Sequence, residues 1–545
     1  MSEESSIEPV LDALVLGAGF AGLHALYRLR SNGLKVLALE AAPDVGGAWY
    51  WNRYPGARCD VESLVYCYTF TPLLDEGWKW SERYAKRDEI QAYLRWAADK
   101  LDLRRDIRFN SRVVSAVFDD QRNLWTFRTE SGETYRARHF FSAAGPITTP
   151  IMPDIPGLKD FKGLVIHTAR WPERSPDFTG KRVGIIGTGS SAVQTIPIVA
   201  EQCERLTVLM RTANFYSPAR NRPLTAADYE WWEKNRELTR HRLQNCLRWG
   251  GGDIMLDDDI NDAMFKTAGE FTPQRRREIY EARYENGGGV VGWAFCDAMA
   301  DIKVNQEAAD FLRGKIGTIV ANPRTAEKLT PRGYAYGTKR CTVGTDFYET
   351  FNRDNVELVD IKSEPIERFT PEGAIVGGRT IELDVLISAS GFDALTGALT
   401  SIDLRGVGGK SLKESWAQGP HSHLGISVHR FPNLYMVGGP GSPSVLTNVV
   451  MTNEMQVEWI AGLIAHCGSQ GFRRCEATRE AEEQWTRHVN ELVKGTLWEN
   501  ANSWYVGANV PGKPRVILAY VGGYLTYRER CDEERKQGYP GFACS

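Results

Sequence analysis

Long apolar runs, paired cysteines and an excess of one charge are all missing from this sequence of 545 residues. No apolar run approaches the ~18 residues that a membrane-spanning helix requires. The net charge of −3 gives no bulk electrostatic reason to bind nucleic acid or an anionic membrane. The first ten residues are polar and acidic, unlike a targeting peptide, and the last three are not a peroxisomal signal. We therefore expect a cytoplasmic protein.

The ten cysteines are scattered, and no two of them have the C-x-x-C spacing. This pattern argues against a metal site and against a disulfide framework, and it indicates a reducing compartment. A pyridine-nucleotide disulfide reductase needs a redox-active cysteine pair, so the sequence disfavours that enzyme class as well.

Glycine, in contrast, is placed in two fingerprints for dinucleotides. The first is Gly17-Ala18-Gly19-Phe20-Ala21-Gly22, between an apolar run at 11–16 and helical spacing at 23–29. Such glycines let the backbone approach a pyrophosphate at a helix N-terminus. The next expected strand, 35–39, ends in Glu40, whose carboxylate suits an adenosine ribose and repels a 2′-phosphate. The alternative is a purely structural strand–helix turn.

An aromatic loop follows Glu40 and includes Gly47, Trp49 and Asp60. Its glycines and prolines predict an ordered loop that is neither helix nor strand. The density of aromatic side chains is consistent with packing against a flat ring system, and a tucked-in structural loop is the alternative.

The second fingerprint, Gly187-Thr188-Gly189-Ser190-Ser191-Ala192, follows an expected strand at 181–186. The strand after it, 206–210, ends in Arg211-Thr212, where the first unit has an acid. A guanidinium beside a hydroxyl suits a 2′-phosphate, while a solvated arginine is the alternative. The two strand ends therefore predict FAD at the first unit and NADPH at the second.

The remaining chain alternates between helical and strand-like segments. Helices are expected at 228–247, 272–284 and 306–316, with glycine breaks at 250–252 and 287–289. We interpret 218–333 as a helical insertion, in which Trp293, Phe295 and Met299 belong to the core or, alternatively, face a substrate cavity. Strands are expected at 356–359, 383–389 and 434–437, and a helix at 454–464.

A twelve-residue segment resembles the FxGxxxHxxxWP signature of type I Baeyer–Villiger monooxygenases. Its matching residues are Phe161, Gly163, His167, Trp171 and Pro172. The 47–60 loop matches a second family pattern, GxWxxxxYPGxxxD. The resemblance spans nearly the whole chain and is closest to the cyclohexanone, phenylacetone and steroid monooxygenase group.

The resemblance implies roles for individual residues. Arg340 would stabilise a flavin peroxide, Asp60 would hold Arg340 in place, and Lys339 would bind the NADP phosphate. His167 would couple the motion of the domains without acting as a chemical catalyst. The loop Ser442-Pro443-Ser444-Val445-Leu446 would line the substrate pocket. Trp504, in the family's mobile C-terminal segment, would contact both NADP and the substrate.

The family also implies the reaction. NADPH reduces FAD, the reduced flavin captures O2 as a C4a-peroxide, and the peroxide attacks a small or medium-sized ketone to give an ester or lactone. A flavin-containing oxygenase of nitrogen or sulfur is the alternative, although the ending Trp171-Pro172 disfavours it. A flavoprotein sensor without catalysis is a third class. No metal and no obligate protein partner are expected.

The expected fold class is α/β, with two Rossmann-like dinucleotide-binding domains and a helical insertion in the NADP domain. The FAD domain is expected to comprise residues 1–147 and 384–545. The NADP domain is expected to comprise residues 148–217 and 334–383, on either side of the insertion.

Overall fold

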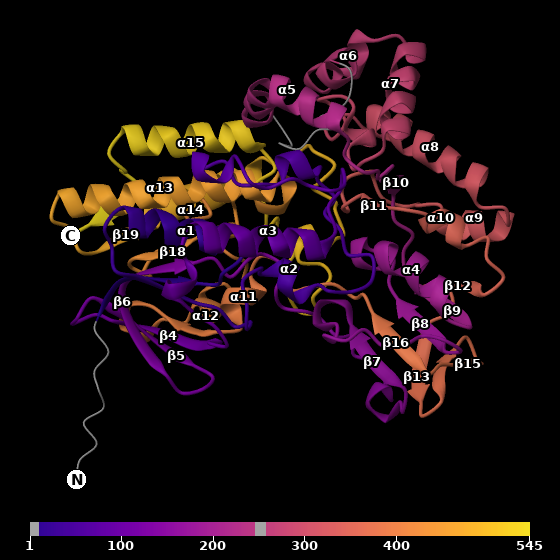
Figure 1. Cartoon of the computed structure of the whole chain (residues 1–545), viewed down its shortest axis with the longest axis horizontal. Helices are drawn as coiled ribbons and strands as arrows, with labels where there is room; N and C mark the ends of the chain where they lie inside the picture. Colours follow the sequence, from indigo (N-terminus) through magenta and orange to yellow (C-terminus); the bar gives the residue numbers. More distant parts are fainter. Residues whose placement is uncertain (1–9, 246–257) are drawn as a thin grey trace.

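The computed structural model describes residues 10–245 and 258–545. Figure 1 shows two α/β units side by side and a lobe of helices, α5 to α8, above the second unit. This arrangement confirms the predicted fold class. The last two residues of the expected helix 228–247 and the expected glycine break at 250–252 lie outside the described residues. None of the described helices combines the length and apolar character needed to cross a membrane.

The first unit is built on an eight-stranded sheet. Its strands run in the order β17-β4-β5-β6-β1-β2-β3, and β18 also pairs with β6. The strands are β1 (Leu11–Leu16), β2 (Val36–Leu39), β3 (Ile107–Arg108), β4 (Val113–Asp119), β5 (Leu124–Thr129), β6 (Thr134–Ser142), β17 (Asp403–Arg405) and β18 (Leu434–Met436). The parallel pairing of β1 with β2 and β6 brings the carboxyl ends of these strands, and the turns after them, to one edge of the sheet.

The second unit has a five-stranded parallel sheet in the order β12-β9-β8-β16-β7. Its strands are β7 (Leu164–His167), β8 (Arg182–Ile186), β9 (Arg205–Met210), β12 (Val356–Asp360) and β16 (Val385–Ser388). Because β16 pairs with both β7 and β8, this sheet extends beyond the expected domain boundary at 383. An apolar run alone does not reveal which of two neighbouring sheets it joins.

Two smaller sheets accompany the second unit. They consist of β10 (Tyr216–Pro218) with β11 (Thr342–Gly344), and of β13 (Ile366–Thr370), β14 (Gly373–Val376) and β15 (Arg379–Glu382). The pair β10–β11 holds together the two ends of the segment that contains the helical lobe.

Two helices of the lobe, α7 and α8, are longer than the sequence predicts, whereas α6 and α9 were not predicted. They are α5 (Ala226–Gln244), α6 (Asp258–Asp262), α7 (Pro273–Asn286), α8 (Ile302–Ile319) and α9 (Pro323–Leu329). The predicted break at 287–289 is present, and Gly287 ends α7 with a φ of +80°. Phe295 and Met299 are buried as expected, whereas Trp293 is only partly buried.

Helices of the nucleotide units cover the two main sheets (Figure 1). They are α1 (Phe20–Ser31), α2 (Ala48–Trp51), α3 (Arg87–Lys100), α4 (Ser190–Gln202), α10 (Phe347–Thr350), α11 (Gly397–Thr400), α12 (Leu412–Ser415), α13 (Val449–Ser469), α14 (Arg479–Glu491) and α15 (Tyr524–Lys536). Helix α13 packs against α1 and begins five residues before the expected helix 454–464. The side chain of Asn448 caps it by accepting hydrogen bonds from the N–H groups of Val450 and Met451.

The prediction that the 46–60 loop contains no helix is wrong, because α2 is a single helical turn within it. Gly46 and Gly47 adopt positive φ values of +140° and +53°. Their carbonyls then accept hydrogen bonds from the N–H groups of Trp49 and Tyr50. Glycine usually ends helices, but here it starts one by turning two carbonyls toward the following residues.

Candidate active site

The first glycine turn joins β1 to α1 with very little space around it. Gly17 has a φ of +101°, and a methyl group at Gly22 would lie 1.9 Å from the carbonyl oxygen of Gly17. Helix α1 begins after Gly19, so its first N–H groups face the turn. Phe20 contributes only its backbone there, because its ring is buried against Tyr66 and Tyr68. The turn therefore has the shape that a pyrophosphate requires.

Glu40 follows β2 at this edge and is only 4% exposed. Its two carboxylate oxygens accept hydrogen bonds from the N–H groups of Ala18 and Ala42, each at 2.7 Å. Burial raises the pKa of Glu40, and these backbone bonds oppose the rise. Each oxygen keeps a lone pair for a ribose hydroxyl, so the residue fits the role that the sequence suggests.

The aromatic loop comes back onto the first glycine turn. A Cβ atom at Gly47 would lie 3.0 Å from the Cα atom of Gly19, so the two backbones are in contact. Trp49 is partly buried, and its indole N–H donates to the hydroxyl of Tyr66 at 3.1 Å. The two segments predicted to bind FAD thus form one continuous wall.

The second glycine turn joins β8 to α4 and repeats the first. Gly187 has a φ of +110°, and a Cβ atom there would lie 2.8 Å from the carbonyl oxygen of Ala389. A Cβ atom at Gly189 would meet nothing within 4 Å, and α4 begins at Ser190 and Ser191. The N–H groups of these first residues face a gap that a pyrophosphate fits.

Positive charge gathers at the end of β9, where the second unit departs from the first. Arg211 is exposed, and the neighbouring Thr212 accepts a hydrogen bond at its carbonyl oxygen from the hydroxyl of Thr188. Burial lowers the pKa of Lys339, and the nearby charges of Arg211 and Lys362 lower it further. None of the three cations has an ion-pair partner within the described part of the chain. Three unpaired cations fit a 2′-phosphate.

The expected pair of Asp60 and Arg340 is present. One carboxylate oxygen of Asp60 accepts from Nε of Arg340 at 2.9 Å and from Nη2 at 2.6 Å. Nη1 donates to the carbonyl oxygen of Val445 at 2.9 Å. Asp60 raises the pKa of Arg340 most, and Tyr505 raises it further. The guanidinium is therefore fixed from two sides, yet its side chain stays 34% exposed.

A cavity of about 120 Å³ lies at this guanidinium. The first unit, the lobe, the segment after the lobe and the C-terminal segment all contribute to its walls. The lining residues are Asp60, Val61, Glu62, Tyr84, Gly289, Val290, Trp293, Gly337, Lys339, Arg340, Cys341, Val343, Val445, Leu446, Thr447, Asn448 and Tyr505. The alternative interpretation of Trp293, that it faces a cavity, thus agrees with the structure.

The predicted substrate loop lies beside this cavity but only partly faces it. Val445 and Leu446 line the cavity, whereas Ser442, Pro443 and Ser444 are buried and absent from its walls. Trp504 is likewise absent from the walls, although its ring contacts that of the lining residue Tyr505 in a tilted arrangement, with ring centroids 4.2 Å apart. The substrate and NADP contacts of these residues remain predictions.

The twelve-residue signature lies where the chain crosses between the two units. Phe161 packs on Phe369, and a Cβ atom at Gly163 would lie 2.3 Å from the ring of Phe161. Trp171 is buried in the core of the second unit, while Pro172 is exposed. These residues pack the segments before and after β7, the edge strand of the second sheet, against β13 and the core of the second unit.

His167 ends β7 beside the crossing itself. Its Nδ1 atom accepts from the N–H of Ala169 at 3.0 Å, and its ring packs edge-on against Phe392. Burial lowers the pKa of His167 to about 4, so the ring is neutral at working pH. Phe392 belongs to one of two crossing segments, which pair through the N–H of Ile151 and the carbonyl of Gly391. This position fits a role in coupling the units, which remains a prediction.

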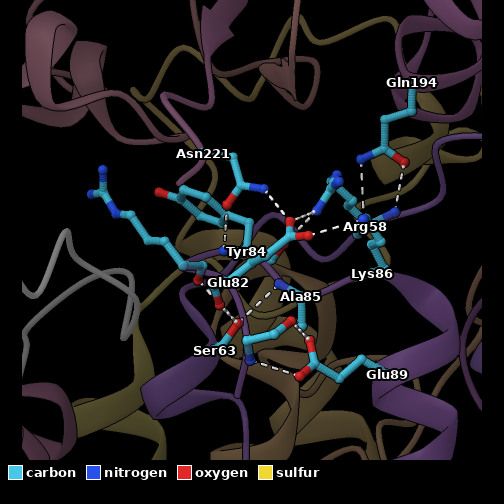
Figure 2. A network of polar contacts seen from close by, with 11 residues as sticks. Arg58, Ser63, Glu82, Tyr84, Ala85, Lys86, Glu89, Gln194 and Asn221 are labelled. Atoms are coloured by element: carbon cyan, nitrogen blue, oxygen red, sulfur yellow. Dashed lines mark hydrogen bonds and ion pairs between the residues drawn. The ribbon is translucent and has the colours of Figure 1, made fainter. Parts of the chain in front are cut away.

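Figure 2 shows a polar network close in sequence to Asp60. It joins the first unit to α4 of the second unit and to the segment that follows β10. Glu82 accepts hydrogen bonds from Arg58 and from Asn221, the latter at 2.6 Å, and pairs with Lys86 at 3.0 Å. Burial raises the pKa of Glu82, but these bonds outweigh the effect, so the pKa is lowered overall. Gln194 of α4 accepts from the N–H of Arg58 and donates to its carbonyl.

Apart from Arg58, which belongs to the aromatic loop, the sequence pointed to none of the residues of this network. Lys362 and Tyr505 were missed as well. Tyr505 adjoins Trp504 in a segment that we singled out, so the signal was present but assigned to its neighbour. Lys362 has no sequence signal, because only the pairing of β12 with β9 brings it to Lys339.

Comparisons with known proteins identify the family. Residues 14–222 match the family model described as pyridine nucleotide-disulphide oxidoreductase. Acetone monooxygenase (methyl acetate-forming) of Gordonia sp. (strain TY-5) is 40% identical, covering 98% of this chain and 99% of that protein. A Baeyer–Villiger monooxygenase of Pseudooceanicola batsensis is also 40% identical, over 97% and 95% of the two chains. This chain belongs to the Baeyer–Villiger monooxygenases.

A structure of oxidized steroid monooxygenase bound to NADP superimposes with a TM-score of 0.91, at 45% identity and with 98% and 99% of the two chains covered. A phenazine N-monooxygenase of Lysobacter antibioticus is 38% identical over 97% and 96% of the chains, so the family also contains an enzyme named for oxidation of nitrogen. These relatives and structures confirm the prediction that the chain is a flavin-dependent monooxygenase that uses FAD and NADP.

Proposed function

We propose that this enzyme inserts one oxygen atom of O2 beside the carbonyl of a small to medium-sized ketone, giving an ester or lactone. The observation that carries this proposal is the charge of Arg340, held by Asp60 at a cavity between the two nucleotide units.

FAD and NADPH, when bound, would supply the electrons and activate O2, so little acid–base chemistry is left for the protein. The main task of the chain is electrostatic. Arg340 cannot lose its proton at working pH, and it places a fixed cation where negative charge develops. Asp60 and the carbonyl of Val445 aim that cation, because each accepts a hydrogen bond from a different part of the guanidinium.

The two cofactors would be held by similar glycine turns but by side chains of opposite charge. At the first unit, the glycine turn cradles the pyrophosphate and Glu40 accepts from the ribose. At the second unit, the N-terminus of α4 receives the pyrophosphate, while Arg211, Thr212 and Lys339 hold the 2′-phosphate.

Water would be excluded from the cavity by the C-terminal segment. Ser503 donates to the carbonyl of Thr338 at 2.8 Å, and Asn509 donates to the carbonyl of Phe392 at the crossing between units. Trp504 lies between these two anchors. A dry site strengthens the field of a fixed cation.

A panel of substrates tests the reaction. Purified enzyme with FAD and NADPH is given acyclic, cyclic and aryl ketones together with an amine and a sulfide, and products are identified by gas chromatography. The expected result is ester or lactone from at least one ketone, in proportion to the NADPH consumed. Oxidation of the amine or sulfide alone would favour the nitrogen or sulfur oxygenase instead, a reaction for which the similarity to the phenazine N-monooxygenase leaves room.

A further inference from the structure

Three cysteines that are far apart in the sequence meet at the end of the first unit, away from the candidate active site. Cys467 lies near the end of α13, Cys475 begins β19 (Cys475–Ala477), and Cys544 ends β20 (Phe542–Cys544). The sulfur of Cys544 lies 3.5 Å from that of Cys467 and 3.1 Å from that of Cys475. All three sulfurs lie within 4.8 Å of one another.

The cluster is held rigidly by its backbone. Cys475 and Cys544 face each other across the antiparallel pair β19–β20. Asn433 fixes Cys475 from the other side, because its side-chain oxygen accepts from the N–H of Cys475 while its own N–H donates to the carbonyl of that residue. Cys467 and Cys475 are buried. The sulfurs therefore need no large rearrangement to act together.

The surroundings of the sulfurs also point to a ligand. The hydroxyl of Tyr435 is buried and makes no hydrogen bond of ordinary geometry within the described residues. Its pKa is raised first by burial and then by the three cysteines, which places the hydroxyl beside them. Three sulfurs at this spacing can act as ligands together, and the thiolate is the form of cysteine that binds metals.

We propose that Cys467, Cys475 and Cys544 form a binding site for a thiophilic metal ion such as Zn²⁺. A tetrahedral ion with metal–sulfur bonds of about 2.3 Å holds its sulfurs about 3.8 Å apart, so the observed separations need only small adjustments. Cys544 is partly exposed, which gives the ion an entry path and lets water take the fourth position. On binding, each thiol gives up its proton to solvent and the sulfur forms a bond to the metal.

A metal explains the cluster better than a disulfide does, because a disulfide would use two of the sulfurs and leave the third beside it without a role. Helix α13 has 21 residues, and at about 1.5 Å per residue its length separates the cluster from Asn448 at the cavity by about 30 Å. We therefore assign the ion a structural task, which is to fasten the C-terminal strand β20 to α13 and β19.

The test uses the reduced, tag-free holoenzyme with FAD bound. After incubation with Zn²⁺ and desalting, elemental analysis is expected to find about one zinc per chain, and Zn²⁺ is expected to raise the Tm. Cys544→Ala removes a partly exposed side chain near the end of the chain, so folding is expected to survive. It should weaken zinc binding at least about tenfold, judged against a competing chelator.

Cys531→Ala is the matched control, because Cys531 is fully buried but lies outside the cluster. This variant should bind zinc as the wild type does. The proposal is overturned if the reduced wild type retains no more zinc than Cys544→Ala. It is also overturned if mass spectrometry finds a Cys475–Cys544 disulfide and Zn²⁺ changes neither the zinc content nor the Tm of the reduced protein. Neither readout depends on oxygenation, so the result stands apart from the proposed function.

Discussion

The two nucleotide units share one backbone design but differ in how far their charged residues are exposed to solvent. Glu40 of the first unit is buried and is held by two backbone N–H groups. Arg211 of the second unit is exposed, and Lys339 beside it is only partly buried. We infer that the first unit keeps its cofactor through turnover, whereas the second exchanges a cofactor with solvent. Removal of charge should therefore abolish binding at one unit and only weaken it at the other.

The largest effect is expected where the two units meet. Arg340→Ala should still bind FAD and accept electrons from NADPH, but it should form no detectable ester. Its loss removes a preorganised cation, and such interactions are often worth roughly 3–4 kcal/mol in the transition state. Stopped-flow absorbance separates flavin reduction from oxygenation, with the product assayed in parallel. Asp60→Ala, which leaves the cation but releases it, should impair the same step less. Near-normal ester formation by Arg340→Ala would mean that another cation performs this task.

Replacement of the buried acid comes next in size. Glu40→Lys should yield a protein largely free of FAD, because a buried ammonium replaces the acceptor of the N–H groups of Ala18 and Ala42. Absorbance of the purified protein at the flavin band measures the bound fraction. Glu40→Gln keeps an acceptor at this position and should retain more FAD. Equal, full occupancy in both variants would show that the carboxylate does not hold the ribose.

Loss of one exposed cation should be milder. Arg211→Ala should weaken the binding of NADPH by roughly 1.5–3 kcal/mol, or about 10- to 150-fold, and leave the binding of NADH nearly unchanged. The ratio of kcat/KM for the two cofactors measures this. Arg205→Ala is the matched control, because Arg205 is also exposed on β9 but pairs with Glu357 at the far end of the strand. If Arg211→Ala keeps the wild-type ratio, the phosphate lies elsewhere.

The pH dependence of cofactor selectivity should separate the units further. The pKa of Lys339 lies below the ordinary lysine value because of burial and the charges of Arg211 and Lys362. As pH rises through that lowered pKa, Lys339 loses its proton, so NADPH affinity should fall while NADH affinity does not. KM measured from about pH 7 to about pH 9 tests this, below the range in which free lysine, with a pKa of about 10.4, titrates. Lys339→Arg should remove the dependence, because arginine stays charged.

Local sequence patterns predicted the turns of both units well. Each fingerprint packs its determinants into consecutive residues, so Gly17 to Gly22 and Gly187 to Ala192 could be placed without tertiary information. The strand end after each, Glu40 or Arg211, lies at a fixed distance along the chain. The pair of Asp60 and Arg340 is separated by 280 positions, and only the family resemblance connected them.

What the sequence could not predict depends on contacts between distant segments. Lys362 joins the phosphate site through strand pairing, and β16 joins the second sheet through its neighbours on both sides. The cysteines argued against a metal site by their spacing, yet β19–β20 pairing brings two of them face to face. Spacing rules detect sites built within one segment, and they miss sites that the fold assembles from several.

The smallest expected effect concerns the network that ties the units together, and it tests whether their relative position matters for coupling. Asn221 joins the end of the β10 segment to the first unit, because it donates to Glu82 and accepts from the N–H of Tyr84 at 2.9 Å. Asn221→Ala should leave both groups without this partner, which costs roughly 1–2 kcal/mol. We expect cofactor binding to stay nearly normal while less ester forms per NADPH consumed.

The control for this variant is Glu89→Gln, in the same network but confined to the first unit, where Glu89 bonds only to Ser81 in the described part of the chain. It should leave the ratio of ester to NADPH unchanged. Asn221 lies outside the cavity wall, although its partner Tyr84 lines the cavity, so a lower ratio in Asn221→Ala reports on how the β10 segment is held against the first unit and not on a direct contact of Asn221 with the substrate. If both variants lower the Tm equally and neither changes the ratio of ester to NADPH, the network contributes to stability alone. Asp60 and Val445 would then hold Arg340 in place without support from the second unit.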